Sequence, residues 1–208
     1  GTADSFEILH QQLVERKEAI SHQFFQESEM LSSMVEHLAE SSQWINDLPI
    51  QNQDFRAFEG GLRRVYGSGR RRMKLAYKIG DSPEKFHNWR KRVKDLWYQM
   101  EFLQPLWPAV LGVTAIELHW LSDYLGDAHD AAVLADYIEE NQGALADEVG
   151  VVALPGLLYE YRRKLEQKAQ PLGLRLYAEE PEDFGRRMAT YWGVWQQYGA
   201  EEREALPG

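Results

Sequence analysis

The stretch from Pro83 to Leu103 reads PEKFHNWRKRVKDLWYQMEFL, and it decides the fold class. Its apolar residues recur every three or four positions, which is the period of one helix face: Trp89, Val93, Leu96, Met100 and Leu103. Just before the stretch stand a glycine, an N-cap candidate and a first-turn proline, at Gly80, Ser82 and Pro83. This combination marks the end of one helix and the start of the next. The sequence therefore predicts a helix that begins at Pro83.

The same spacing continues outward from this stretch in both directions, and no convincing run of alternating polar and apolar residues appears. We therefore expect an all-α protein built as an antiparallel helical bundle. Gly126 followed by Asp127 is typical of a helix end and a new N-cap, so a very short αα-hairpin is expected there. The expected helices cover about 4–40, 54–79, 83–104, 108–125, 127–138, 155–168 and 181–195.

The charge of the chain is unevenly distributed. The 208 residues include 33 acidic and 23 basic side chains, which gives a net charge of -10. Residues 56–94 hold 13 Lys or Arg and only 3 acidic residues, so this segment is +10 and the remainder is -20. The total charge disfavours a polyanionic ligand, whereas the local excess of cations favours one.

The composition also excludes several classes of site. The chain has no cysteine, which rules out a disulfide scaffold, a thiolate nucleophile and a zinc site of the cysteine type. The longest apolar stretches are too short and too interrupted by proline and glycine to span a bilayer. No glycine-rich phosphate loop is present. We expect a cytoplasmic protein that uses neither a membrane nor a cofactor.

Basic residues gather on two neighbouring predicted helices. His87, Arg90, Lys91 and Lys94 stand at i, i+3, i+4 and i+7, on the face opposite the apolar stripe. The preceding helix carries a second basic set: Arg63, Arg64, Arg70, Arg71, Arg72, Lys74 and Lys78. The sequence predicts a positively charged trough between the two helices for a multiply charged anion. The alternative is a solvated charged face, or one that pairs with acidic residues elsewhere.

A histidine and aspartate cluster follows at His119, Asp123, Asp127, His129 and Asp130. If the hairpin forms, these residues converge at one end of it. Imidazole and carboxylate groups placed together can bind a divalent metal ion. A metal-dependent phosphohydrolase that acts on polyphosphate is therefore an alternative function. Helix capping and orientation of carboxylates is the stronger explanation, because no specific ligand spacing is present.

Aromatic residues are abundant, and aromatic side chains next to arginine can stack single-stranded bases. A nucleic-acid-binding helical bundle is therefore a further alternative. Trp89 and Trp192 lie on helical core patterns, so core packing explains most of these residues better. Nucleic acid is accordingly disfavoured as a partner.

Two runs in this order resemble the CHAD family, the conserved-histidine α-helical domain. The first is FHNWRKRVKDLWY over residues 86–98, and the second is LHWLSDYLGDAHDAAVL over residues 118–134. Together with the basic helix before them and the tail near residues 172–179, the resemblance touches most of residues 55–180. Trp97 stands where many members have another arginine, and residues 1–54 contain no earlier copy of the basic helix and its hairpin.

The resemblance implies a domain of two pseudo-symmetric helical bundles with a basic groove that binds inorganic polyphosphate. It also implies polyphosphate granules or triphosphatase-type enzymes as partners. We expect residues 1–208 to form one such domain that lacks part of its first bundle, with a basic core at 55–130. His87, Arg90 and Lys94 match the basic motif of the family, and Gly126 and Asp130 match its hairpin.

The sequence thus favours a non-catalytic polyphosphate-binding module without a metal. Its expected binding residues are Arg63, Arg64, Arg71, Lys74, Lys78, His87, Arg90, Lys91, Lys94, Arg162 and Arg163, with His119 and His129 as accessory residues. Protonation of His87 is expected to strengthen binding below about pH 6.5.

Overall fold

The computed structural model is all-α, as the sequence predicts. It describes residues 6–26, 32–40, 55–78, 82–143, 145 and 150–205, and none of these residues lies in a strand. No helix in these ranges is long and apolar enough to cross a membrane. The prediction of a helical fold from the period of the apolar residues is therefore confirmed.

The chain divides into two compact units, each of which is described by itself. The first unit contains residues 1–52 and 137–155, with the helix α1 (Glu7–Gln26) and a shorter helix over residues 32–40. In this unit the hydroxyl of Tyr137 donates to Gln12 at 3.4 Å, and the guanidinium of Arg16 lies over the Tyr137 ring. The expected helix over 4–40 corresponds to these two helices, and residues 27–31 lie outside the described ranges.

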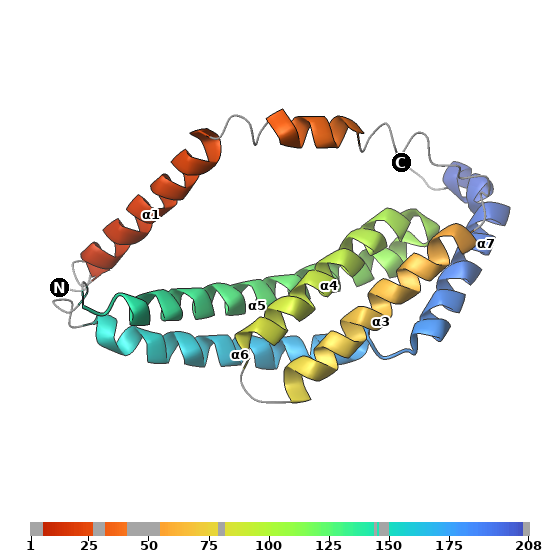
Figure 1. The fold of residues 1–208 in the computed structure, drawn as a ribbon. Helices are drawn as coiled ribbons and strands as arrows, with labels where there is room; N and C mark the ends of the chain where they lie inside the picture. Colours follow the sequence, from red (N-terminus) through yellow and green to blue (C-terminus); the bar gives the residue numbers. More distant parts are fainter. Residues whose placement is uncertain are drawn as a thin grey trace. The chain divides into compact units, whose positions relative to one another are not determined.

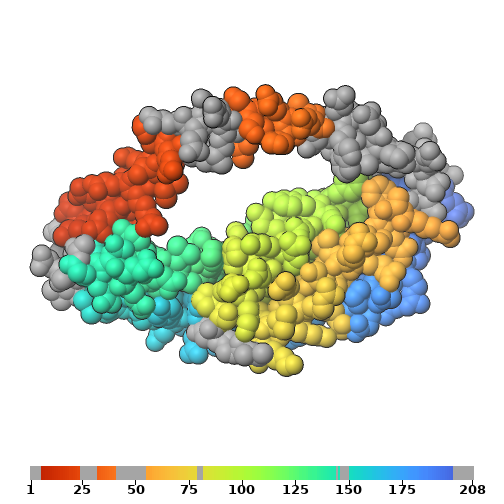
Figure 2. Space-filling view, viewed as in Figure 1, coloured from red at the N-terminus to blue at the C-terminus, as the bar shows by residue number. Residues whose placement is uncertain are grey.

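The second unit contains residues 53–136 and 156–208 and holds the basic segment. Its first elements along the chain are α3 (Arg56–Lys78), α4 (Pro83–Leu103), the short 3-10 turn η2 (Gln104–Leu106) and α5 (Pro108–Glu140). The part of α5 up to Asp136 belongs to this unit. After the 3-10 turn η3 (Val151–Ala153) of the first unit come α6 (Leu154–Leu176) and α7 (Pro181–Ala205). Pro83, Pro108 and Pro181 each open a helix, because a proline at the first position loses no hydrogen bond. Helices α3 and α4 lie side by side (Figures 1 and 2).

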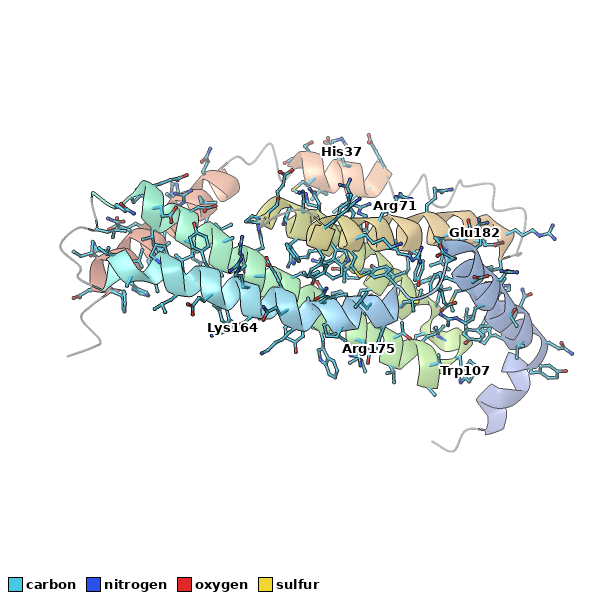
Figure 3. All side chains as sticks on the ribbon, turned by 90° about the horizontal axis from the view of Figure 1, so that it is seen from below. His37, Arg71, Trp107, Lys164, Arg175 and Glu182 are labelled. Carbon is cyan, nitrogen blue, oxygen red and sulfur yellow. The ribbon has the colours of Figure 1, made fainter. Side chains whose placement is uncertain are left out.

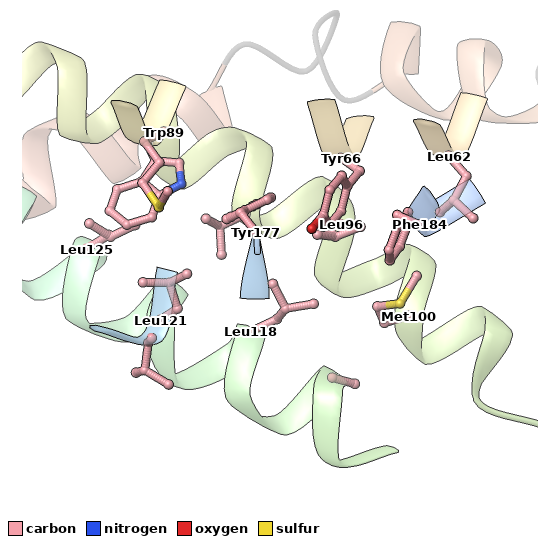
Figure 4. Close-up of a cluster of buried hydrophobic side chains, with 14 of the residues drawn as sticks. Leu62, Tyr66, Trp89, Leu96, Met100, Leu118, Leu121, Leu125, Tyr177 and Phe184 are labelled. Atoms are coloured by element: carbon pink, nitrogen blue, oxygen red, sulfur yellow. The ribbon is translucent and has the colours of Figure 1, made fainter. Parts of the chain in front are cut away.

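A single apolar core holds the second unit together (Figure 4). The predicted stripe of α4 supplies its centre, since Trp89, Val93 and Met100 are fully buried. Leu62 and Tyr66 reach this core from α3, and the Tyr66 ring stacks on Phe184 of α7 at 4.0 Å between centroids. Leu118, Leu121 and Leu125 complete it from α5. Burial of these side chains fixes which face of each helix is left for solvent and ligands.

The predicted hairpin at Gly126 is wrong, because α5 runs without a break from Pro108 to Glu140. Gly126 is buried in the middle of this helix, and its missing side chain leaves room for Arg90 of α4. A Cβ atom at this position would lie 3.1 Å from Nε of Arg90. The glycine therefore allows close approach of another helix, where the sequence suggested a helix end.

Candidate functional site

The basic residues of α3 fall into two sets with different surroundings. The first set faces α7, where acidic residues neutralise it. Arg63 forms an ion pair with Glu182 at 2.7 Å. Arg70 binds both carboxylate oxygens of Glu180, at 2.5 and 2.6 Å, and its Nε donates to the carbonyl of Tyr177 at 3.2 Å. These arginines attach α3 to the start of α7.

Arg187 of α7 extends the same arrangement. Its guanidinium binds Glu179 with a shortest distance of 2.6 Å, and the backbone N–H of Glu179 donates to the hydroxyl of Tyr66 at 3.1 Å. The hydrogen bond from Arg63 holds the pKa of the Glu182 carboxyl below its usual range. The acidic residues between α6 and α7 are therefore committed to structural arginines.

The second set on α3 points away from the core. Its members stand seven, three and four residues apart, so they form one exposed stripe: Arg64, Arg71, Lys74 and Lys78. Within the described ranges no acidic side chain forms an ion pair with any of them. Figure 3 labels Arg71 of this second set on α3, and Glu182, the partner of Arg63, at the start of α7. The described acidic side chains therefore leave the charge of this stripe unneutralised.

The basic motif of α4 lies on the flank of that helix that faces α5. The rings of His87 and His129 are 4.2 Å apart between centroids, and Arg90 lies against Gly126. Nδ1 of His87 and Nε of Arg90 are buried and have no hydrogen-bond partner in the described part of the chain. Lys94 lies over the Tyr98 ring at 5.8 Å, and Lys91 is exposed.

The pKa of His87 is lowered from its usual value. Burial of the ring is the largest cause, and the neighbouring His129, Lys91 and Arg90 lower the pKa further because each disfavours a second positive charge. The free protein therefore holds His87 in its neutral form at neutral pH.

The two stripes occupy the outward side of one helix pair, but they do not face each other. The α4 stripe turns toward α5, whereas Arg71 lines a cavity of about 380 Å³ with Pro181 and Glu182 at the start of α7. Between them, on the α3 side of α4, lies the ion pair of Arg92 with Asp95 at 3.0 Å. The predicted cations of α3 and α4 therefore form two separate stripes with different neighbours, and not the single trough expected between the two helices.

The two predicted arginines of α6 have separate surroundings. Arg162 is 2% exposed, and its Nε lies 3.7 Å from the Glu166 carboxylate one turn along the helix. Arg163 is exposed and lines a cavity of about 510 Å³ together with Tyr77 and Phe86. Arg162 stands three residues before the buried Leu165, and this position on the apolar face is a signal for its burial.

The histidines of α5 do not converge as the predicted hairpin requires. His119 binds Asp123 at 3.1 Å and packs edge-on against the Trp97 ring at 4.4 Å. Ten residues of continuous helix separate His119 from His129, which corresponds to about 15 Å along the axis. Among the described residues no three His, Asp or Glu side chains are placed to hold a metal ion.

Comparison with known proteins gives one match. A family model described as the CHAD domain matches residues 7–139, which is more than half of the chain. The matched range begins and ends earlier than the stretch 55–180 over which the motifs show their resemblance. The search of curated proteins and the search of solved structures each found no match.

Proposed function

The chain belongs to the CHAD family, and from this premise we propose that it is a non-catalytic module that binds inorganic polyphosphate. The proposed binding surface consists of the outward stripe of α3 and the basic motif of α4: Arg64, Arg71, Lys74, Lys78, His87, Arg90, Lys91 and Lys94. Arg63 and Arg162 are omitted from the surface because both are ion-paired to glutamates.

The observation that carries this proposal is the row of cations without acidic partners on α3 and α4. The protein has ten more acidic than basic side chains. No acidic side chain in the described ranges nevertheless forms an ion pair with these cations of α3 and α4. Like charges at this density repel one another, so a multiply charged anion that binds the row relieves the repulsion. A linear chain of phosphates has the charge density and length for such a surface.

The roles of the residues follow from their geometry. The exposed lysines supply mobile point charges, and Arg64 and Arg71 supply forked donors for phosphate oxygens. Among the described residues Arg90 has a buried N–H without an acceptor, and a turn of its side chain toward a phosphate oxygen would satisfy it. Binding releases counterions condensed on the polymer, so the affinity must fall as salt concentration rises.

Calorimetric titration with long-chain polyphosphate at two salt concentrations tests the proposal. We expect saturable binding that weakens at the higher concentration, and a loss of about tenfold in affinity for the double variant Lys91→Ala/Lys94→Ala. The matched control is Lys164→Ala/Arg175→Ala, which removes two exposed cations of α6 and leaves the surface intact. Absent or salt-insensitive binding contradicts the proposal, and so does an equal loss in the control.

The proposal extends to the cellular partners of the surface. We place the protein in the cytoplasm with polyphosphate granules, alongside triphosphatase-type enzymes that act on the same polymer. Competition with a single-stranded oligonucleotide at equal phosphate concentration separates this ligand from nucleic acid. We expect polyphosphate to displace the oligonucleotide, and the reverse order of affinity contradicts the assignment.

A further inference from the structure

An apolar groove lies between the first turns of α3 and the last turns of α4, and the binding of phosphate chains makes no use of it. Its volume is about 380 Å³. Its lining includes Phe58 and Arg64 of α3 and Tyr98, Gln99 and Phe102 of α4. Three of its rings are exposed to solvent, with exposed fractions of 41% for Phe58, 52% for Tyr98 and 70% for Phe102. Exposed rings around a groove of this size are typical of a small-molecule site.

One polar atom of the groove lining, the side-chain oxygen of Gln99, lacks a partner among the described residues. The side-chain oxygen of Gln99 is buried and forms no hydrogen bond within the described residues. A buried amide without a partner costs free energy, which a ligand with a complementary N–H edge recovers. The heterocyclic edge of a purine offers such donors and acceptors, and adenine pairs with a carboxamide through two hydrogen bonds.

Arg64 connects this groove with a second, charged cavity. Its guanidinium lies over two glycines of α3, since a Cβ atom at Gly60 would be 3.4 Å from Nη1 and one at Gly61 would be 3.9 Å from Nη2. The same residue also lines the cavity of about 380 Å³ that holds Arg63, Arg71 and Glu182. One arginine therefore borders an apolar groove on one side and a cationic cavity on the other.

The apolar groove and the cationic cavity on either side of Arg64 fit chemically different parts of one ligand. The groove suits a flat ring that stacks on aromatic side chains, and Arg64 and Arg71 suit a short chain of phosphates. The cavity retains a net positive charge, because Glu182 neutralises only Arg63. Inorganic polyphosphate satisfies the cations but has no atoms to place among the rings.

We propose that the groove and the cavity together form a site for a nucleoside triphosphate, with the base between Phe58, Tyr98 and Phe102 and the phosphates at Arg64 and Arg71. Gln99 recognises the edge of the base, and adenine is the base it fits. The site goes beyond polyphosphate binding, because it depends on apolar contacts that the polymer does not make. Since Arg64 and Arg71 also belong to the polyphosphate surface, the two ligands compete.

The test compares ATP with inorganic triphosphate in the absence of divalent cations, so that the two ligands carry similar charge. Binding is followed by calorimetry and by quenching of tryptophan fluorescence, because Trp97 stacks on Tyr98. We expect ATP to bind about tenfold more tightly than triphosphate, since stacking of one base contributes about 1–3 kcal/mol. Equal affinities for the two ligands overturn the proposal.

Two variants with the same kind of truncation locate the site. Phe102→Ala removes an exposed groove ring, and Trp120→Ala removes a similarly exposed ring of α5 outside the groove. We expect Phe102→Ala to reduce ATP affinity to that of triphosphate and Trp120→Ala to leave it unchanged. The affinity of both variants for long-chain polyphosphate should equal that of the parent, so a failure of this site is distinguishable from a failure of polyphosphate binding.

The groove has one competing occupant, which is another protein chain. If ATP binds no better than triphosphate, and the protein self-associates in a manner that Phe102→Ala abolishes, the groove is a protein contact and the nucleotide assignment is wrong. Equal loss of ATP binding in both variants also overturns it.

Discussion

Helix α3 carries two pairs of adjacent arginines, and the two members of each pair have different surroundings. In each of the pairs Arg63–Arg64 and Arg70–Arg71, the first residue turns toward α7 and binds a glutamate, and the second points outward without an acidic partner in the described ranges. One residue along a helix rotates the side chain by about 100°, which is enough to exchange an ion pair for solvent. The position around the helix therefore decides whether an arginine is neutralised within the fold or stays charged at the surface.

The difference has an energetic basis. The Arg70 side chain is only 19% exposed and makes a two-pronged pair with Glu180, so its loss leaves an acceptor and a backbone carbonyl without a partner. Arg71 makes no such contact with any described residue, so its loss should scarcely affect folding. The following variants separate these roles.

Charge reversal of the outward stripe should have the largest effect. In the double variant Arg71→Glu/Lys74→Glu, two attractions to phosphate become repulsions, and the dissociation constant for long-chain polyphosphate should rise on the order of 100-fold. Calorimetric titration measures it. The control Lys164→Glu/Arg175→Glu makes the same change of net charge on α6 (Figure 3). A similar loss in both variants would show that net charge, and not the stripe, governs binding.

Removal of an inward arginine should affect stability instead. We expect Arg70→Ala to lower the free energy of unfolding by about 1–2 kcal/mol, because one partner carboxylate is itself 60% exposed and screened by solvent. Thermal and urea unfolding measure this change. Arg71→Ala, one position along, should stay within about 0.5 kcal/mol of the parent. Equal destabilisation by the two variants would refute the division.

A side chain added at Gly126, where α5 lies against Arg90 of α4, should have a smaller effect on binding. Gly126→Ala places a methyl group against Arg90, whose side chain must move, so polyphosphate affinity should fall about threefold to fivefold. Stability should change by less than about 1 kcal/mol, because better helix propensity offsets the crowding. In an Arg90→Ala background the same substitution should have no further effect on affinity. Additive losses would mean that Gly126 acts by another route.

Acidification should give the smallest effect. Burial and the neighbours His129, Lys91 and Arg90 lower the pKa of His87 in the free protein, and a polyanion bound beside the ring raises it again. The complex therefore binds more protons than the free protein, and affinity should rise about threefold between about pH 7 and about pH 5.5. His87→Gln should reduce this dependence. An affinity that is constant over this range would exclude His87 from the binding surface.

The same shift has the opposite consequence for stability. Because the folded state depresses the pKa of His87, the unfolded chain binds more protons as the pH falls below about 6.5. The free protein is therefore expected to lose stability on acidification through this window, and bound polyphosphate should counteract the loss.

The sequence predicts the elements of the fold better than the relations between them. The apolar period placed the core stripe of α4, and the prolines marked three helix starts, because both signals are local. The prediction of a hairpin at Gly126 was wrong because this glycine makes room for the side chain of Arg90 on another helix. Arg90 is distant in sequence, so no local pattern reveals the contact. Likewise, the local sign that distinguishes Arg63 from Arg64 is Glu59 one turn before it, at 3.9 Å. Its closer acidic partner, Glu182 of α7, lies more than a hundred residues away.

The outward stripe of α3 has one property that concerns motion. Arg64, Arg71 and Lys78 are separated by seven residues each, so the charges recur at about 10.5 Å along the helix axis. A uniform polymer presents the same oxyanion repeatedly along its length. It can therefore shift from one cation of the stripe to the next and form similar contacts. If polyphosphate binds this stripe as proposed, it would have several degenerate registers and could slide along the helix without dissociating.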